Sequence, residues 1–114
     1  MASDCLFCKI IAGQIPATVV HRGERLTAIR DINPAAPTHI LLLPNEHIGS
    51  VAEADPAQGA LLGELLLTAA AVAQQEGLSQ GYRLVINTGA DGGQSVAHLH
   101  VHLLGGRAMR WPPG

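Results

Sequence analysis

The alternation of apolar and polar positions divides the chain into short elements. Residues 5–13 are typical of a short helical opening. Two β-prone runs follow, 18–22 and 26–30, and the Gly-Glu pair between them predicts a hairpin. The run 38–44 is apolar at nearly every position, which predicts a central strand that is buried on both faces.

One long amphipathic helix is predicted over residues 55–77. Asp55 is a suitable N-cap, Pro56 stands at the first helical position, Gln58 occupies the capping-box position, and Gly77 is a natural stop. The apolar residues between these signals recur at helical spacing and form one broad face, which we expect to cover a sheet. They are Leu61, Leu62, Leu65, Leu66 and Val72.

The second half of the chain predicts two further strands, 82–87 and 96–104, joined by a Gly-rich loop over 88–95. The total is about five strands, one long helix and one short helix. Strands grouped before and after a helix favour an α+β meander over a parallel doubly wound sheet. We expect one domain over residues 1–114, with the last ten residues forming an arm that packs on a neighbouring subunit.

Composition excludes several classes of partner. The net charge is −2, the seven Lys and Arg residues are scattered, and the chain has one Phe, one Tyr and one Trp. This pattern argues against a surface for a nucleic acid polymer, so a bound nucleotide is expected to be a small molecule in a pocket. No apolar run approaches the roughly 18 to 20 residues that cross a bilayer, and the first residues carry no secretory signal, so we expect a cytoplasmic protein without membrane contact.

Three histidines stand at alternating positions in the segment His98-Leu-His100-Val-His102. In an extended segment this spacing places the three imidazoles on one side and the aliphatic residues on the other. Three interpretations are open: a polar outer face, a metal site, or phosphoryl chemistry, which we favour. A neutral imidazole is a good nucleophile when its second nitrogen is held by a partner, so His100 would attack phosphorus and form a phosphohistidine, while His102 would donate to a phosphate oxygen.

The Gly-rich loop over residues 88–95 ends directly before these histidines. Its glycines allow backbone N–H groups to converge on an anion, although many such loops are simple turns. Its last residue, Ser95, is placed to donate to a leaving group. The loop therefore predicts a cradle for a phosphate.

Cys5 and Cys8 are separated by two residues, a spacing that supplies half of a tetrahedral zinc site. A redox pair or two small buried thiols are the alternatives. Two cysteines cannot make a disulfide framework, and in a reducing compartment this spacing favours metal or redox chemistry.

The motif His98-Leu-His-Val-His-Leu-Leu resembles the signature of the histidine-triad (HIT) superfamily, in which apolar residues alternate with three histidines. The stretch Gly92-Gly-Gln-Ser-Val and the tail over 105–114 are similar to the Hint branch of purine nucleoside phosphoramidases. The resemblance spans nearly the entire chain and includes residues 7–11, 31–39 and 81–87.

The resemblance implies a homodimer that hydrolyses the P–N bond of purine nucleoside phosphoramidates of the AMP-amine type through a nucleotidyl-histidine intermediate. A dinucleoside polyphosphate hydrolase of the same superfamily is an alternative, against which the Hint-like tail argues. A nucleotide-binding regulatory protein with little turnover is a second, and the presence of His100 and Ser95 argues against it. A metal carrier that uses the three histidines is a third.

Residue by residue, the resemblance implies that His100 is the nucleophile, that His39 orients it, and that His102 and Ser95 complete the catalytic group. It places Asp31 at the ribose hydroxyls. The other residues implied at the nucleotide are Phe7, Ile32, Asn87, Gly93, Gln94, Val96, His98 and Trp111.

Simpler interpretations exist for three of these residues. Asp31 before Asn-Pro is typical of a turn, His39 in a buried strand is typical of a core histidine, and Trp111 could serve packing alone.

For the metal site, the resemblance implies His47 and His98 beside the two cysteines. With four protein ligands such a zinc would be structural, and no cofactor is expected for catalysis. Ala97 stands where Hint relatives often carry a larger residue, which leaves the rim of the pocket undefined.

Overall fold

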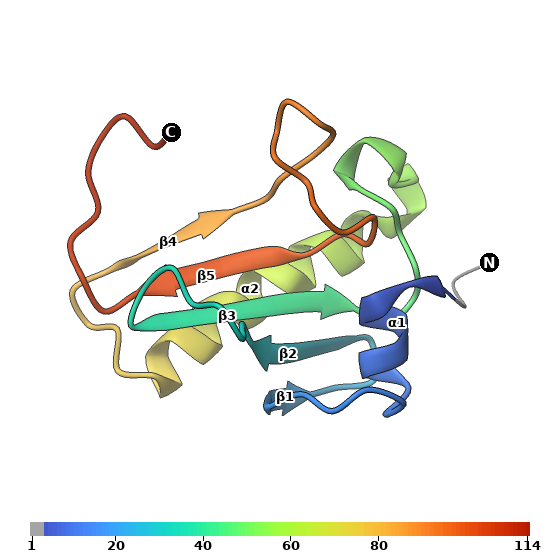
Figure 1. Cartoon of the computed structure of the whole chain (residues 1–114), viewed down its shortest axis with the longest axis horizontal. Helices are drawn as coiled ribbons and strands as arrows, with labels where there is room; N and C mark the ends of the chain where they lie inside the picture. Colours follow the sequence, from blue (N-terminus) through green and yellow to red (C-terminus); the bar gives the residue numbers. More distant parts are fainter. Residues whose placement is uncertain (1–3) are drawn as a thin grey trace.

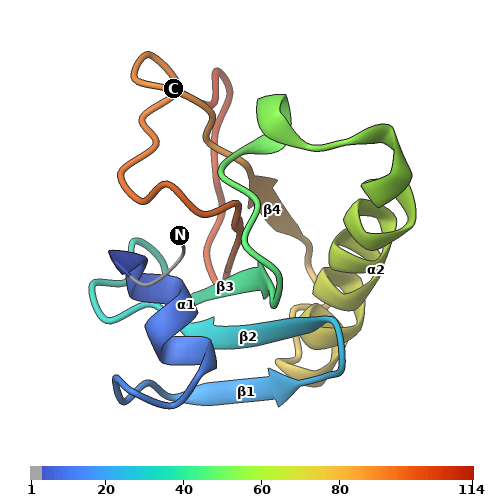
Figure 2. The same ribbon diagram turned by 90° about the vertical axis from the view of Figure 1, so that its right-hand side faces the viewer.

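The computed structural model describes residues 4–114, so the first three residues, on which the absence of a signal sequence partly rests, lie outside it. Five strands form one antiparallel sheet in the order β1-β2-β3-β5-β4, with helix α2 on one face and the short helix α1 on the other (Figures 1 and 2). The strands are β1 (Val19–Arg22), β2 (Leu26–Arg30), β3 (Thr38–Pro44), β4 (Tyr82–Val85) and β5 (Val101–Gly105). The α+β architecture and the first hairpin are confirmed.

The long helix begins as its capping signals predict. The Asp55 carboxylate accepts a hydrogen bond from the Ala57 N–H at 2.8 Å, and the Gln58 side chain accepts from the Asp55 N–H at 2.7 Å. The first turn is a 3-10 helix, η3 (Pro56–Gln58), which continues into α2 (Gly59–Gln75). Gly77 follows with a φ of +74°, a left-handed conformation that ends helices at low cost. The remaining helices are α1 (Leu6–Ile11) and the 3-10 turn η2 (Val51–Glu53).

The expectation that no segment is long and apolar enough to cross a bilayer is wrong. The 20 residues Pro56–Gln75 pass this test on length and composition, with a mean hydropathy of 1.3. In the fold this helix lies on the sheet, and 28% of its most apolar window is buried. Its buried side chains belong to the core: Leu61, Leu65, Ala69, Val72 and Ala73.

Two apolar clusters hold the helices to the sheet. Ile40 and Leu42 of β3 face α2, whereas Leu41 and Leu43 face α1, so the prediction that this strand is buried on both faces is confirmed. The cluster under α2 is the larger; its other sheet-side members are Leu26, Ala28, Leu99, Val101 and Leu103. The cluster under α1 adds Phe7, Ile10 and Ile29.

The predicted strand over residues 96–104 is wrong at its N-terminal half, since β5 spans only Val101–Gly105. In the segment before it, the Leu99 N–H donates to the Ile48 carbonyl at 2.6 Å, outside the sheet. Similarly, β4 ends at Val85 rather than at residue 87. The alternation of sides nevertheless holds, because Leu99 belongs to the cluster under α2 while His98 and His100 contact Phe7 of α1.

The C-terminal residues 106–114 form an exposed arm that runs back along β4 (Figure 1). Two arginine contacts hold it: Arg107 donates to the Ala35 carbonyl at 3.0 Å, and Arg83 donates to the Arg110 carbonyl at 2.7 Å. Trp111 is 84% exposed. Its packing on a neighbouring subunit stays a prediction.

Candidate active site and metal centre

A cavity of about 330 Å³ opens on the side of the sheet that carries α1. It combines an apolar wall with a carboxylate, a hydroxyl and two imidazoles. Seven of the residues expected at the site line it: Phe7, Asp31, Ile32, Ser95, Val96, His100 and His102. One cavity therefore joins the helix at the start of the chain, the loop after β2 and the segment before β5.

Sequence reasoning missed most of the apolar wall of this cavity. Ile10 lies three residues after Phe7, so both project from one side of α1, and this helical spacing is the signal that could have identified Ile10. The other lining residues carry no comparable signal: Leu6, Ile15, Pro16, Ala17, Ile29, Arg30, Asn33 and Leu41.

The two nitrogens of His100 have different environments. Nδ1 donates to the His98 carbonyl at 2.7 Å, which leaves the lone pair on Nε2. Within residues 4–114 Nε2 has no hydrogen-bond partner, and no buried side-chain nitrogen or oxygen among these residues is unpartnered, so Nε2 faces open space. The ring packs its edge near Phe7, with centroids 5.1 Å apart. This tautomer has a free lone pair in the cavity, as a nucleophile requires.

His39 and His102 form a directed chain of hydrogen bonds. The Ala35 N–H donates to His39 Nδ1 at 3.0 Å, so the proton of His39 is on Nε2. This Nε2–H donates to His102 Nδ1 at 2.9 Å, which leaves the proton of His102 on its own Nε2. Burial lowers the pKa of both rings, that of His102 to about 4, with the neighbouring His100 adding to the shift. Both imidazoles are therefore neutral near pH 7, and His102 presents an N–H donor.

Asp31 combines the turn chemistry with a place in the cavity. One carboxylate oxygen accepts a hydrogen bond from the Asn33 N–H at 2.8 Å, the turn expected for this sequence. The other lies 3.5 Å from His39 Nε2. Asp31, His39 and His102 thus form a group of potential ligand atoms within 4.8 Å, but the hydrogen bond between the two histidines already explains their proximity.

Several residues expected at the nucleotide hold the Gly-rich loop instead of lining the cavity. Asn87 donates to the Gly92 carbonyl at 2.7 Å. The amide of Gln94 donates to the Gly49 and Val96 carbonyls, while its oxygen accepts from the Gly89 N–H at 3.0 Å. Gly93, Trp111 and His39 are also outside the cavity lining. In the described residues, the loop geometry depends on these side chains.

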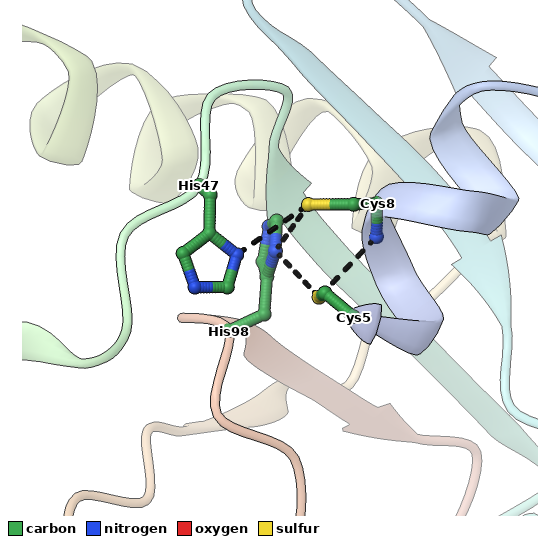
Figure 3. A group of neighbouring side chains, drawn as sticks. All are labelled: Cys5, Cys8, His47 and His98. Carbon is green, nitrogen blue, oxygen red and sulfur yellow. Dashed lines mark hydrogen bonds between the residues drawn. The ribbon is translucent and has the colours of Figure 1, made fainter. Parts of the chain in front are cut away.

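Cys5, Cys8, His47 and His98 converge at the start of α1 with their ligand atoms within 4.8 Å of one another (Figure 3). His98 Nδ1 lies 3.3 Å from Cys5 Sγ and 3.5 Å from Cys8 Sγ, and His47 Nδ1 lies 3.4 Å from Cys8 Sγ. Tetrahedral zinc with ordinary bond lengths separates such ligands by about 3.3 to 3.8 Å. The four residues therefore fit a structural zinc ion, and with two thiolates and two imidazoles no position is left for substrate.

His98 belongs to this centre and not to the cavity. Its Nε2–H donates to the Pro44 carbonyl at 2.9 Å, its Nδ1 faces the thiols, and its side chain is fully buried. Neither nitrogen is free for a phosphate, contrary to the expectation that His98 lines it. The three histidines of the motif also face different partners in the described residues, which argues against a metal carrier that uses them together.

Comparisons with known proteins agree with this arrangement. The family model of the HIT domain matches residues 12–109. The chain is 55% identical to a 14 kDa zinc-binding protein of Zea mays, over 98% of this chain and 89% of that protein, and 51% identical to adenylylsulfatase HINT1 of Arabidopsis thaliana, over 98% and 78%. A crystal structure of a HIT family hydrolase from Legionella pneumophila superposes with a TM-score of 0.95 at 52% identity and covers 97% of this chain and 100% of that chain. The chain therefore belongs to the HIT family, in its Hint-like branch.

Proposed function

We propose that this protein hydrolyses the P–N bond of purine nucleoside 5′-phosphoramidates through a nucleotidyl intermediate on His100. The observation that carries the proposal is the state of that ring: the His98 carbonyl holds Nδ1–H at 2.7 Å, and Nε2 faces a cavity of about 330 Å³. An activated nucleophile beside a pocket of this size suits transfer of a small nucleotide.

In the first step, the lone pair of His100 Nε2 forms a bond to phosphorus while the P–N bond breaks. The leaving nitrogen takes a proton and departs as the amine. Ser95, which lines the same cavity, is the proposed donor of that proton. His102 donates its Nε2–H to a non-bridging oxygen, where negative charge develops.

In the second step, water attacks phosphorus, the bond between phosphorus and Nε2 breaks, and the water passes a proton to the Ser95 oxygen, which restores the hydroxyl that donated in the first step. The nucleoside monophosphate leaves and His100 returns to its starting state. Because the His98 carbonyl accepts the Nδ1–H throughout, the ring keeps the same tautomer before and after both steps.

The rest of the cavity suits a nucleoside. Phe7 and Ile32 offer apolar surfaces for a purine, and the Asp31 carboxylate can accept hydrogen bonds from the two ribose hydroxyls. The apolar wall reads the base by stacking and contact, so the proposal covers adenine and guanine nucleotides alike.

We also propose that the chain acts as a homodimer. β4 is an edge strand of the sheet, and edge strands leave backbone groups available for pairing. On the outer face of α2, Leu66 and Leu67 are exposed. A partner subunit on this face would also give the exposed Trp111 of the arm a surface to contact. We propose that Trp111 approaches the partner's cavity and restricts which leaving groups fit there.

The names of two relatives support parts of the proposal. The adenylylsulfatase of Arabidopsis thaliana supports activity on an adenylyl compound, and the zinc-binding protein of Zea mays supports zinc at the cysteine–histidine centre. Free thiols at that centre suit a reducing compartment, so we place the protein in the cytoplasm. In the proposed dimer, a partner's arm over the cavity would limit the room for a second nucleotide, which disfavours a dinucleoside polyphosphate as substrate.

The test is steady-state hydrolysis of an adenosine phosphoramidate with a fluorogenic amine by wild type, His100→Ala and His21→Ala. We expect His100→Ala to lose at least about a thousandfold in kcat, because removing a nucleophile eliminates the covalent route. Calorimetry should detect AMP binding to all three proteins. His21, a histidine of β1 outside the cavity, is the matched control and should retain activity.

Two results decide against the proposal. If wild type binds AMP but releases no amine, the protein is a nucleotide binder for this substrate class. If His100→Ala turns over as fast as wild type, the nucleophile is another group. Parallel assays with adenylyl sulfate and a diadenosine polyphosphate then identify which leaving group the cavity accepts.

A further inference from the structure

We infer that the cysteine–histidine metal centre positions the nucleophile, through His98 and Phe7, and so controls the rate of transfer. This inference rests on the proposed role of His100. No residue belongs to both the metal centre and the cavity lining, but two residues connect the two sites. His98 is thus a positioning residue rather than a catalytic one.

The first connection is His98 itself. Its imidazole faces both thiols through Nδ1, while its main-chain carbonyl accepts the Nδ1–H of His100 at 2.7 Å. A metal bound to Nδ1 would fix the ring between the thiols and the Pro44 carbonyl, which accepts from Nε2–H at 2.9 Å. Fixing the ring restricts the backbone of the same residue, and hence the direction of the carbonyl that sets the tautomer of His100.

The second connection is Phe7, which lies between Cys5 and Cys8 in the first turn of α1. Its ring packs edge-on to His100 with centroids 5.1 Å apart and to His98 with centroids 5.9 Å apart. A metal that binds both cysteines would therefore fix the helical turn that carries Phe7, whose ring packs against His100. One ion would therefore restrain both Phe7 and the His98 carbonyl, two of the groups that contact the His100 ring.

Besides the packing of Leu99 under α2 and the hydrogen bond from His98 to the Pro44 carbonyl, this segment has few anchors in the described residues. Residues 98–100 precede β5, and the backbone hydrogen bond that anchors them runs from the Leu99 N–H to the Ile48 carbonyl, outside the sheet. His47, the fourth ligand, is exposed. Without a metal, the His98 ring would keep its hydrogen bond to the Pro44 carbonyl, but its Nδ1 side would have only weak contacts with the thiols at 3.3 and 3.5 Å. The His98 carbonyl would then be held less firmly, and His100 would exchange between its two tautomers.

The experiment compares zinc-loaded wild type with the same protein after chelation, below the melting temperature of both. Imidazole nitrogen NMR should resolve one tautomer of His100, protonated at Nδ1, in the loaded protein and averaged signals in the stripped protein. His21 is the internal control, since it contacts neither the centre nor the cavity and its signals should not move. We expect kcat to fall about 10- to 100-fold on stripping, as for loss of a supporting interaction at a reactive group.

His47→Ala keeps the cysteines and His98 and changes no residue that contacts His100. In a zinc titration of this variant, kcat per folded molecule should rise with bound zinc, with the folded fraction taken from circular dichroism. Glu46→Ala, at the adjacent exposed position, is the matched control and should behave as wild type.

Unchanged His100 signals and unchanged kcat on zinc removal, even with a lower melting temperature, would overturn the inference and leave the metal a purely structural role. Failure of the proposed function looks different. In that case the loaded wild type releases no amine, while the NMR comparison still reports whether the ion fixes the ring.

Discussion

The neutral state of His102 predicts a specific loss of stability in acid. Burial, together with the neighbouring imidazoles of His100 and His39, lowers the pKa of this ring to about 4, against the opposing effect of the Asp31 carboxylate. These are the titratable groups that face it from β3, from the loop after β2 and from the segment before β5. In the unfolded chain the same ring titrates near 6.5.

The sign and size of the effect follow from these two values. Between pH 6.5 and 4 the unfolded chain binds a proton that the folded ring does not, so the free energy of unfolding falls as the pH falls through this window. A shift from 6.5 to about 4 corresponds to about 3 kcal/mol, and partial exposure of the ring reduces this figure. Above pH 6.5 the contribution vanishes, because the ring is neutral in both states.

The perturbation is His102→Gln, which removes the titrating group while its side-chain oxygen can still accept the His39 Nε2–H. Urea unfolding of wild type and variant at pH 7, 6, 5 and 4.5 gives the two free energies of unfolding. Wild type should lose about 2 to 3 kcal/mol more than the variant on acidification. Loss of zinc in acid affects both proteins alike and cancels in the difference.

Parallel curves for the two proteins would refute this reasoning, since they would mean that His102 has the same pKa in both states. Direct NMR titration of the His102 ring provides an independent check. A folded-state pKa near 6.5 would mean that a fraction of the His102 rings is protonated at pH 7, so the ring would not be wholly neutral there.

Two further predictions concern packing and the loop. Leu65→Ala should lower the free energy of unfolding by about 3 kcal/mol in urea denaturation, because Leu65 of α2 is 1% exposed, whereas Gln74→Ala, at an exposed position on the same helix, should change it little. Equal losses would contradict the assigned face. Gly92→Ala should reduce kcat/KM about tenfold, since a Cβ there would meet the Thr88 carbonyl oxygen and displace the loop before Ser95. An unchanged kcat/KM would mean that the position of this loop does not affect the active site.

The segment around the three histidines shows which structural features could be predicted from the sequence and which could not. Alternation correctly predicted which side chains share a side, because any extended backbone has this period. It did not predict the hydrogen-bond partners. β5 pairs with β3 only from Val101 onward, although β3 continues to Pro44, and β4 ends at Val85 opposite His102, so residues 98–100 lie outside both ladders.

The site shows the same limit. The residues of the motif and of the Cys-x-x-Cys pair were found from the chain, since their types and spacing carry the chemistry. Main-chain groups were not: the Ala35 N–H that fixes the tautomer of His39, and the Pro44 carbonyl that occupies His98, depend on the folded backbone. Gln94 was expected at the nucleotide, but three backbone contacts hold its amide in the loop.

The separation of the two apolar clusters has a consequence for sequence change. The larger cluster, under α2, contributes none of the residues that line the nucleotide cavity, whereas the smaller one, under α1, contributes Phe7, Ile10, Ile29 and Leu41. Substitutions that reshape the cavity therefore alter only a small part of the buried apolar surface. A protein built in this way can acquire new substrates by drift on one side of the sheet while the other side keeps it folded.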